Sequence, residues 1–174
     1  NYKNERTSRW TMVKKWNTPL ILGVGRFTEQ KNFELLIRAF AIVRQKIDAK
    51  LIIIGEGHLK NNLISLAKSF DLQGHFSFPG FVKNPYKYMA NSSLVVLSSN
   101  YEGFGNVLVE AMACGTQVIS TDCNSGPSEI LENGLWGTLV PVNDELELAK
   151  AIIDSLEKKK YHNVLKRAKD FSID

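Results

Sequence analysis

The chain has 174 residues, of which 44% are hydrophobic and 23% charged, a composition typical of one globular domain with a buried core. It contains no run of eighteen apolar residues, so the sequence predicts no membrane-spanning helix. The net charge of +4 resides in the first 17 residues, because the rest of the chain holds equal numbers of acidic and basic residues. A folded body without a basic excess argues against nucleic acid as a partner.

The first 17 residues form a basic leader in front of the patterned part of the chain, residues 18–174. Such a leader is typical of a linker or arm, and contact with an anionic membrane surface stays open. The chain has two cysteines, Cys114 and Cys123, too few for a disulfide framework or a metal cluster. We therefore expect a reducing, cytoplasmic setting.

Short apolar runs alternate with amphipathic stretches along the rest of the chain. The runs predict strands at 20–24, 51–54, 75–78, 94–97, 118–120 and 138–140. The stretches predict helices at 33–46, 59–70, 85–90, 106–114, 127–131 and 146–156. This order predicts a doubly wound α/β fold of about six parallel strands with helices on both faces.

Ligands bind such sheets at the carboxyl ends of the strands, where this sequence places its glycine-bearing turns. The turn after the first predicted strand, G-V-G-R-F-T-E-Q-K-N, matches the dinucleotide-binding fingerprint incompletely, because Thr28 stands where the third glycine belongs. It is not a P-loop either, because no G-K-[ST] follows. After Gly25 it offers Arg26 and Lys31, two cations suited to phosphate oxygens.

A second turn follows the predicted strand 94–97, where Tyr101 to Gly115 reads Y-E-G-F-G-N-V-L-V-E-A-M-A-C-G. Two glycines, Gly103 and Gly105, allow unusual backbone conformations and a close approach by a ligand. The helix that starts after them presents unpaired N–H groups and the positive end of its dipole, which predicts an anion site.

Seven residues separate Glu102 on this turn from Glu110 in the helix. A helical side chain leans toward the N-terminus, so both carboxylates can line one pocket and accept hydrogen bonds from sugar hydroxyls. The alternative stays open that Glu110 is a solvated helix residue and Glu102 a helix-capping acid.

Other kinds of chemistry find little support. No G-x-S-x-G elbow is present, and His58, His75 and His162 lack metal-ligand spacing, so we expect structural or solvated roles for them. A response-regulator receiver domain, which shares this fold class, needs acids where the first strand here ends in Gly25-Arg26.

Three segments in order, G-R-F-T-E-Q-K-N-F-E-L-L-I-R-A-F, E-G-F-G-N-V-L-V-E-A-M-A-C-G and S-G-P-S-E-I-L, resemble the C-terminal domain of retaining glycosyltransferases of family 4, which have the GT-B fold. The resemblance covers about residues 19–158. It implies the donor-binding half of a two-domain enzyme, inactive alone, with residues 1–17 as interdomain linker, residues 18–174 as the nucleotide-sugar-binding domain and the C-terminal helical region truncated.

The resemblance also implies roles for the site residues. Arg26 and Lys31 would bind the donor diphosphate and stabilise the charge that develops on it, Glu102 would contact the donor sugar, and Glu110 would bind the ribose. No metal or cofactor is expected. The other donor-binding residues would be Gly25 and Gly103, then Gly80, Phe81 and Val82 around the base, and Phe104, Gly105, Asn106 and Val107 around sugar and phosphate.

The S-G-P-S-E-I-L segment is similar to members that use UDP-sugars, which favours UDP over GDP. We expect transfer of a hexose or N-acetylhexosamine to a glycan or lipid-linked acceptor, by a cytoplasmic protein with peripheral membrane contact as an open alternative. Two other functions stay open: a non-catalytic nucleotide-binding scaffold of the same fold, and a GT-B sugar-nucleotide epimerase.

Overall fold

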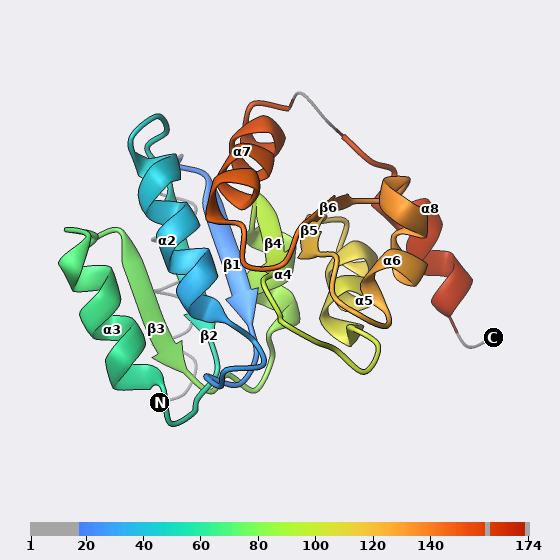
Figure 1. Ribbon diagram of the computed structural model, residues 1–174. Coiled ribbons are helices and arrows are strands. Elements are labelled where there is room, and N and C mark those ends of the chain that lie inside the picture. The colour runs from blue at the N-terminus through green and yellow to red at the C-terminus, as the bar shows by residue number, and fades with distance from the viewer. Residues whose placement is uncertain (1–17, 159–160, 173–174) are drawn as a thin grey trace.

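The structure is a computed structural model that describes residues 18–158 and 161–172 (Figure 1). The basic leader, residues 1–17, lies outside the described residues.

Six parallel strands form one sheet in the order β3-β2-β1-β4-β5-β6. The order reverses between β1 and β4, and this switch point is where open α/β sheets bind ligands. The fold class predicted from the sequence is confirmed. The strands are β1 (Leu20–Val24), β2 (Lys50–Ile54), β3 (Phe76–Gly80), β4 (Leu94–Leu97), β5 (Gln117–Thr121) and β6 (Thr138–Val140).

Helices cover both faces of the sheet (Figure 1). One face carries α2 (Phe33–Arg44), α3 (Lys60–Ser69) and α7 (Glu145–Leu156). The other carries α4 (Tyr86–Asn91), α5 (Asn106–Ala113), α6 (Pro127–Ile130) and α8 (Val164–Ala168). Two short 3-10 helices follow α6 and α8, at Glu132–Gly134 and Lys169–Phe171. No helix among these described residues is long and apolar enough to cross a membrane.

The two layers of helices explain why the strands are continuous apolar runs. In β4, Leu94 and Val96 pack into the core under α2, α3 and α7, whereas Val95 and Leu97 pack into the core on the opposite face. Because alternate side chains of a strand point to opposite faces, every position of β4 is buried and apolar.

Three details differ from the sequence-based expectation. Gly23 lies within β1, where a Cβ atom would come within 3.0 Å of Leu36, so it makes room for α2 and is not part of a turn. The strand expected at 75–78 continues through Pro79 and Gly80, which an edge strand tolerates because one side of it needs no ladder N–H. The C-terminal helix α8 was not predicted from the sequence.

Candidate functional site

The turn between β1 and α2 is fixed by Phe27, whose side chain is fully buried. Its backbone N–H donates to the Glu56 carbonyl (2.9 Å) and its carbonyl accepts from the Leu59 N–H (3.1 Å). A Cβ atom at Gly57 would lie 2.5 Å from the Phe27 carbonyl oxygen, so the two loops meet backbone to backbone. Arg26 precedes this anchor and its side chain is exposed at the sheet edge.

Lys31 reaches across the switch point to Glu102, and Nζ lies 2.6 Å from Oε1. The two side chains are only 18% and 7% exposed, so this ion pair is largely shielded from water. The stem of Lys31 lies over Gly25, where a Cβ atom would be 3.2 Å from three of its carbons. Gly25 therefore leaves the space through which Lys31 reaches the carboxylate.

Three buried hydroxyl groups form hydrogen bonds around the Lys31–Glu102 pair. Ser99 donates to Glu102 Oε1 (2.5 Å), and Ser98 donates to the backbone carbonyl of Lys31 (2.9 Å). Thr121, at the end of β5, donates to the Ser99 carbonyl (2.6 Å). All three residues are fully buried. Sequence reasoning missed them, although two serines directly after the apolar run 94–97 are a usable signal for polar groups at the carboxyl end of a strand.

Asn32 joins three loops at the same edge. Its side-chain oxygen caps α2 by accepting from the Leu35 N–H (3.3 Å), and its amide donates to Asn100 (3.1 Å) and Asn143 (2.8 Å). Asn100 in turn donates to the Glu29 carbonyl (2.9 Å). The loops after β1, β4 and β6 are thereby tied together beside the Lys31–Glu102 pair.

The glycine turn of the second motif leads directly into α5. Gly105 is left-handed (φ 99°) and is the N-cap of α5, and no side chain caps this end of the helix. Asn106 is exposed and Val107 half-buried at that start. Gly103 does not need a left-handed conformation, and a Cβ atom there would meet nothing within 4 Å. The expectation of an unusual backbone thus holds for Gly105 and is wrong for Gly103.

Glu110 is half-buried on α5, one turn after Asn106. Burial raises the pKa of its carboxyl group above the usual 4.5, because the charged form loses solvation. Glu110 is therefore not the freely solvated helix residue that the sequence left open as an alternative.

The S-G-P-S-E-I-L segment lies against the glycine turn. Gly126, with φ 86°, packs so closely that a Cβ atom would be 1.8 Å from the Phe104 carbonyl oxygen.

At the end of β3, Gly80 is buried, Val82 is half-buried and the ring of Phe81 is 75% exposed. The structure thus leaves an aromatic ring open to solvent at the carboxyl edge of the sheet.

The histidines have other partners. His58 pairs with Glu29 (2.9 Å), His75 lies between Arg44 and Lys50, and His162 contacts the Leu135 carbonyl (3.0 Å). Within the part of the chain that the structure describes, no group of three or more His, Cys, Asp or Glu residues could hold a metal ion.

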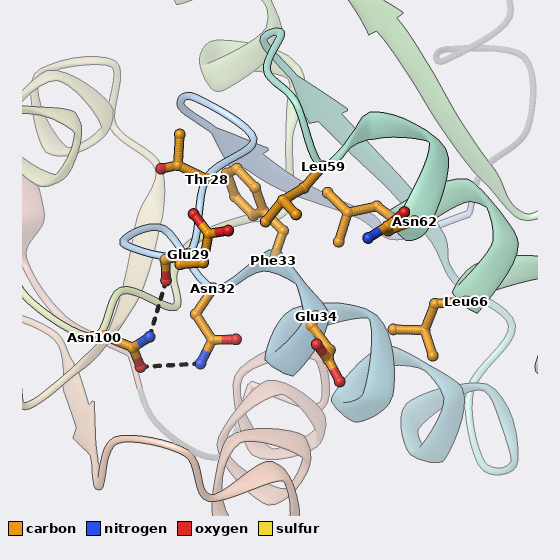
Figure 2. Close-up of a pocket in the computed structure, with 10 residues that line it drawn as sticks. Thr28, Glu29, Asn32, Phe33, Glu34, Leu59, Asn62, Leu66 and Asn100 are labelled. Carbon is orange, nitrogen blue, oxygen red and sulfur yellow. Dashed lines mark hydrogen bonds between the residues drawn. The ribbon is translucent and has the colours of Figure 1, made fainter.

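A cavity of about 380 Å³ lies between the starts of α2 and α3 (Figure 2). Its lining contains no lysine or arginine, so it does not suit a diphosphate, and neither Lys31 nor Glu102 is part of it. The lining residues are Thr28, Glu29, Asn32, Phe33, Glu34, Leu59, Asn62, Leu63, Leu66 and Asn100.

The doubly wound parallel sheet, with the Lys31–Glu102 pair at its switch point, is the architecture of a Rossmann-like domain. The comparisons agree with this class, because the family model described as "Glycosyl transferases group 1" matches residues 4–171. The chain belongs to this glycosyltransferase family.

Named relatives extend the likeness. The chain is 44% identical to the N-acetylgalactosamine-N,N'-diacetylbacillosaminyl-diphospho-undecaprenol 4-alpha-N-acetylgalactosaminyltransferase of Campylobacter jejuni over 87% of this chain and 42% of that protein. It is 32% identical to the N-acetyl-alpha-D-glucosaminyl L-malate synthase of Bacillus anthracis over 87% of this chain and 40% of that protein.

Among solved structures, the chain resembles HepE from Anabaena in complex with UDP and glucose. The TM-score is 0.84 and the identity 25%, over 95% of this chain and 47% of HepE. The chain therefore spans less than half the length of these three proteins.

Proposed function

We propose that the chain is the donor-binding domain of a retaining glycosyltransferase that takes a hexose or N-acetylhexosamine from a UDP-sugar. The observation that carries the proposal is the shielded Lys31–Glu102 pair at the switch point, with Arg26 exposed on the same turn. A glycan or lipid-linked acceptor would be bound by another part of the whole protein.

The electrostatics of the pair suit a diphosphate. An ammonium group has three N–H donors, so the bond to Glu102 leaves Lys31 donors for phosphate oxygens. Arg26 adds a forked donor, and the start of α5 adds N–H groups and the positive end of its dipole. These fixed positive groups supply the charge that a metal ion would otherwise bring, so we expect no metal requirement.

In this proposal, Glu102 and Glu110 bind different parts of the donor. Glu102 is held by Lys31 and Ser99 and accepts hydrogen bonds from the sugar hydroxyls close to the reacting carbon. Glu110, further along α5, accepts from the ribose hydroxyls. Phe81, with its exposed ring, flanks the base.

The chemistry is displacement of UDP from the sugar. The bond between the anomeric carbon and the β-phosphate oxygen breaks, and UDP leaves with the bonding electrons. The acceptor hydroxyl transfers its proton to a leaving phosphate oxygen as its own oxygen bonds to the same face of the sugar. Charge develops on the leaving oxygens, where Arg26 and Lys31 stabilise it more than in the ground state. Preorganised charge of this kind is usually the largest contribution to the rate.

The choice of UDP and of the acceptor is supported by the relatives. HepE was solved with UDP and glucose, and the names of the Campylobacter and Bacillus proteins contain N-acetylhexosamines. The Campylobacter name also contains a diphospho-undecaprenol group, a lipid carrier. We propose a cytoplasmic location, with peripheral contact at the inner face of the membrane for the case of a lipid-linked acceptor.

The test is titration calorimetry of the 174-residue chain with UDP, GDP and ADP. We expect UDP to bind most tightly, and Lys31→Ala to weaken UDP binding about 10- to 100-fold, the effect of one hydrogen bond to a charged group. Lys46→Ala, an exposed lysine beyond the C-terminal end of α2, is the matched control and should bind UDP normally. No heat with any of the three nucleotides would exclude the proposal.

A further inference from the structure

The C-terminal segment, residues 161–171, packs against α5 and α6 on one face of the sheet (Figure 1). Within it, Arg167 is nearly buried, with 12% of its side chain exposed. Its Nε donates to the Ile130 carbonyl (2.8 Å) and its Nη2 to the Glu129 carbonyl (3.0 Å). Arg167 therefore bonds two carbonyls at the end of α6.

The remaining guanidinium nitrogen is also used. Nη1 of Arg167 lies 2.9 Å from Glu132 and 2.9 Å from Asp170. Two carboxylates, one after α6 and one in the segment itself, thus hold the guanidinium plane in one orientation. An arginine that is bound to four partners in this way is a rigid connector, since moving it breaks several charge-assisted bonds together.

The face of the guanidinium covers a phenylalanine. Cζ of Arg167 lies 4.7 Å from the ring centroid of Phe171, and that ring meets Phe104 edge-on, with centroids 6.0 Å apart. Phe104 belongs to the glycine turn of the donor site, and its carbonyl rests on the backbone of Gly126 at the start of α6. Phe104 is therefore held on its ring side by Phe171 and on its backbone side by α6, and Arg167 contacts both supports.

We propose that Arg167 is a positioning residue for the donor site: through Phe171 and α6 it fixes Phe104, and so it sets where the backbone N–H groups at the start of α5 point. This inference rests on the proposed function, because it assigns the turn Gly103–Val107 to the donor.

The C-terminal segment does not need Arg167 to stay attached. Gln117 donates to the His162 carbonyl (2.8 Å) and accepts from the His162 N–H (2.9 Å). Val164, the first residue of α8, also has its side chain buried in the hydrophobic core on this face of the sheet. Replacing Arg167 therefore removes the link to Phe104 while this second anchor remains.

The experiment compares Arg167→Ala, Arg167→Lys and Phe171→Leu with a matched control, Arg38→Ala. Arg38 also pairs with an acid, Glu34 (2.9 Å), and covers a phenylalanine ring, Phe70 (5.8 Å), but it lies on α2. For each variant we would measure Tm, amide hydrogen exchange of residues 104–108 under native conditions, and UDP affinity well below Tm.

We expect faster exchange at residues 104–108 in all three Arg167 and Phe171 variants, with UDP affinity lower by about 3- to 10-fold, the loss that one misplaced hydrogen bond produces. Arg167→Lys should not restore either readout, because an ammonium cannot make the same planar set of bonds. Arg38→Ala should change neither. If Arg167→Ala prevents folding, the milder Arg167→Lys and Phe171→Leu variants give the same readouts.

A purely structural role for Arg167 predicts a lower Tm with unchanged exchange at residues 104–108 and unchanged UDP affinity, and that result would overturn the proposal. If the unmodified chain binds no UDP, the proposed function fails, whereas exchange at residues 104–108 still decides whether Arg167 controls the turn.

Discussion

The Glu102 carboxylate is held by two hydrogen bonds from the protein itself. One oxygen accepts from the Lys31 ammonium (2.6 Å) and from the Ser99 hydroxyl (2.5 Å). A carboxylate has two oxygens with about four lone-pair sites, so these bonds fix its orientation and leave acceptors for a ligand. In the proposed function, Ser99 would therefore act on the sugar through Glu102.

We expect Ser99→Ala to leave UDP affinity unchanged and to reduce the additional affinity that a UDP-sugar has over UDP. The reduction should be about 3- to 10-fold, because one buried hydrogen bond to Glu102 is lost. Ser120→Ala is the control, since Ser120 is equally buried at the end of the neighbouring strand but its hydroxyl donates to the Thr121 carbonyl (2.8 Å). Calorimetry with UDP and UDP-sugars measures both affinities, and an equal effect of the two substitutions would rule out a specific role for Ser99.

Glu110 carries a stability cost that follows from its pKa. Burial raises the pKa of this carboxyl group above 4.5 in the folded protein. Between the unfolded and the folded pKa the folded state holds more protons, so stability falls as pH rises through that window. The cost is absent below the unfolded pKa and fully present above the folded pKa.

Glu110→Gln should therefore raise Tm at pH 7 and give little or no increase at pH 4, where the carboxyl group is largely protonated in both states. The same substitution should weaken UDP binding, because the ribose loses a charged acceptor. Thermal unfolding at the two pH values, with calorimetry at pH 7, checks both effects. A Tm increase of equal size at both pH values would contradict the electrostatic origin.

At the scale of elements, Asn32 combines two functions in one residue. It adopts a left-handed conformation (φ 46°, ψ 51°) as the N-cap of α2, and its amide links the loops that contain Asn100 and Asn143. Asparagine tolerates this conformation better than most residues with a Cβ atom.

Asn32→Ala should lower the free energy of unfolding by about 1–3 kcal/mol, because it removes the cap and strains the left-handed backbone. Asn32→Gly should recover most of this loss, since glycine relieves the strain and costs only a few tenths of a kcal/mol as an N-cap. Urea unfolding of both variants measures the difference. Equal losses in the two variants would show that the side-chain bonds to the other loops dominate.

Most helices and strands could be predicted from the sequence. Helices cover both faces of the sheet, so most strands are continuous apolar runs that stand out in the sequence. The runs 20–24, 94–97 and 138–140 match β1, β4 and β6 residue for residue. The helix α8 could not be predicted, because five residues of ordinary polarity form a helix only through tertiary contacts, here the burial of Val164 and the bonds of Arg167.

The candidate site was predictable in its location and not in its contacts. Alternating elements and glycine turns place Arg26, Lys31 and Glu102 at one sheet edge, since parallel strands end together. The Lys31–Glu102 bond, the Ser99 hydroxyl and the amides of Asn32 depend on loop conformations that no periodicity encodes. Their roles toward the donor stay predictions.

Across the whole molecule, the opposite edge of the sheet carries a cationic cluster. His75, just before β3, lies with Nε2 3.1 Å from Arg44 and Nδ1 3.2 Å from Lys50, and Asp48 pairs with Arg44. Burial, then Arg44 and Lys50, lower the pKa of His75 below its usual 6.5, and the Asp48 carboxylate opposes them weakly.

The unfolded chain therefore binds a proton at His75 more readily than the folded protein. The contribution of His75 to stability should therefore be highest above pH 6.5 and should decline as pH falls below that value, down to the folded pKa. His75→Asn should flatten this decline, measured as the urea midpoint between pH 7 and pH 5. The same slope in the variant and the unmodified protein would exclude His75 as its source.

The hydrogen bonds at the carboxyl edge of the sheet, where the donor is proposed to bind, affect how the protein folds. Lys31–Glu102, Gln30–Tyr101 and Asn32–Asn100 join residues 71, 71 and 68 positions apart. A nascent chain that ends after β3 already contains Arg26 and Lys31 and can pair three strands, yet it has no carboxylate for Lys31 and no start of α5. Under the proposed function, UDP binding needs both parts of this edge, so we expect UDP affinity to appear during refolding only after the segments before and after β3 have joined.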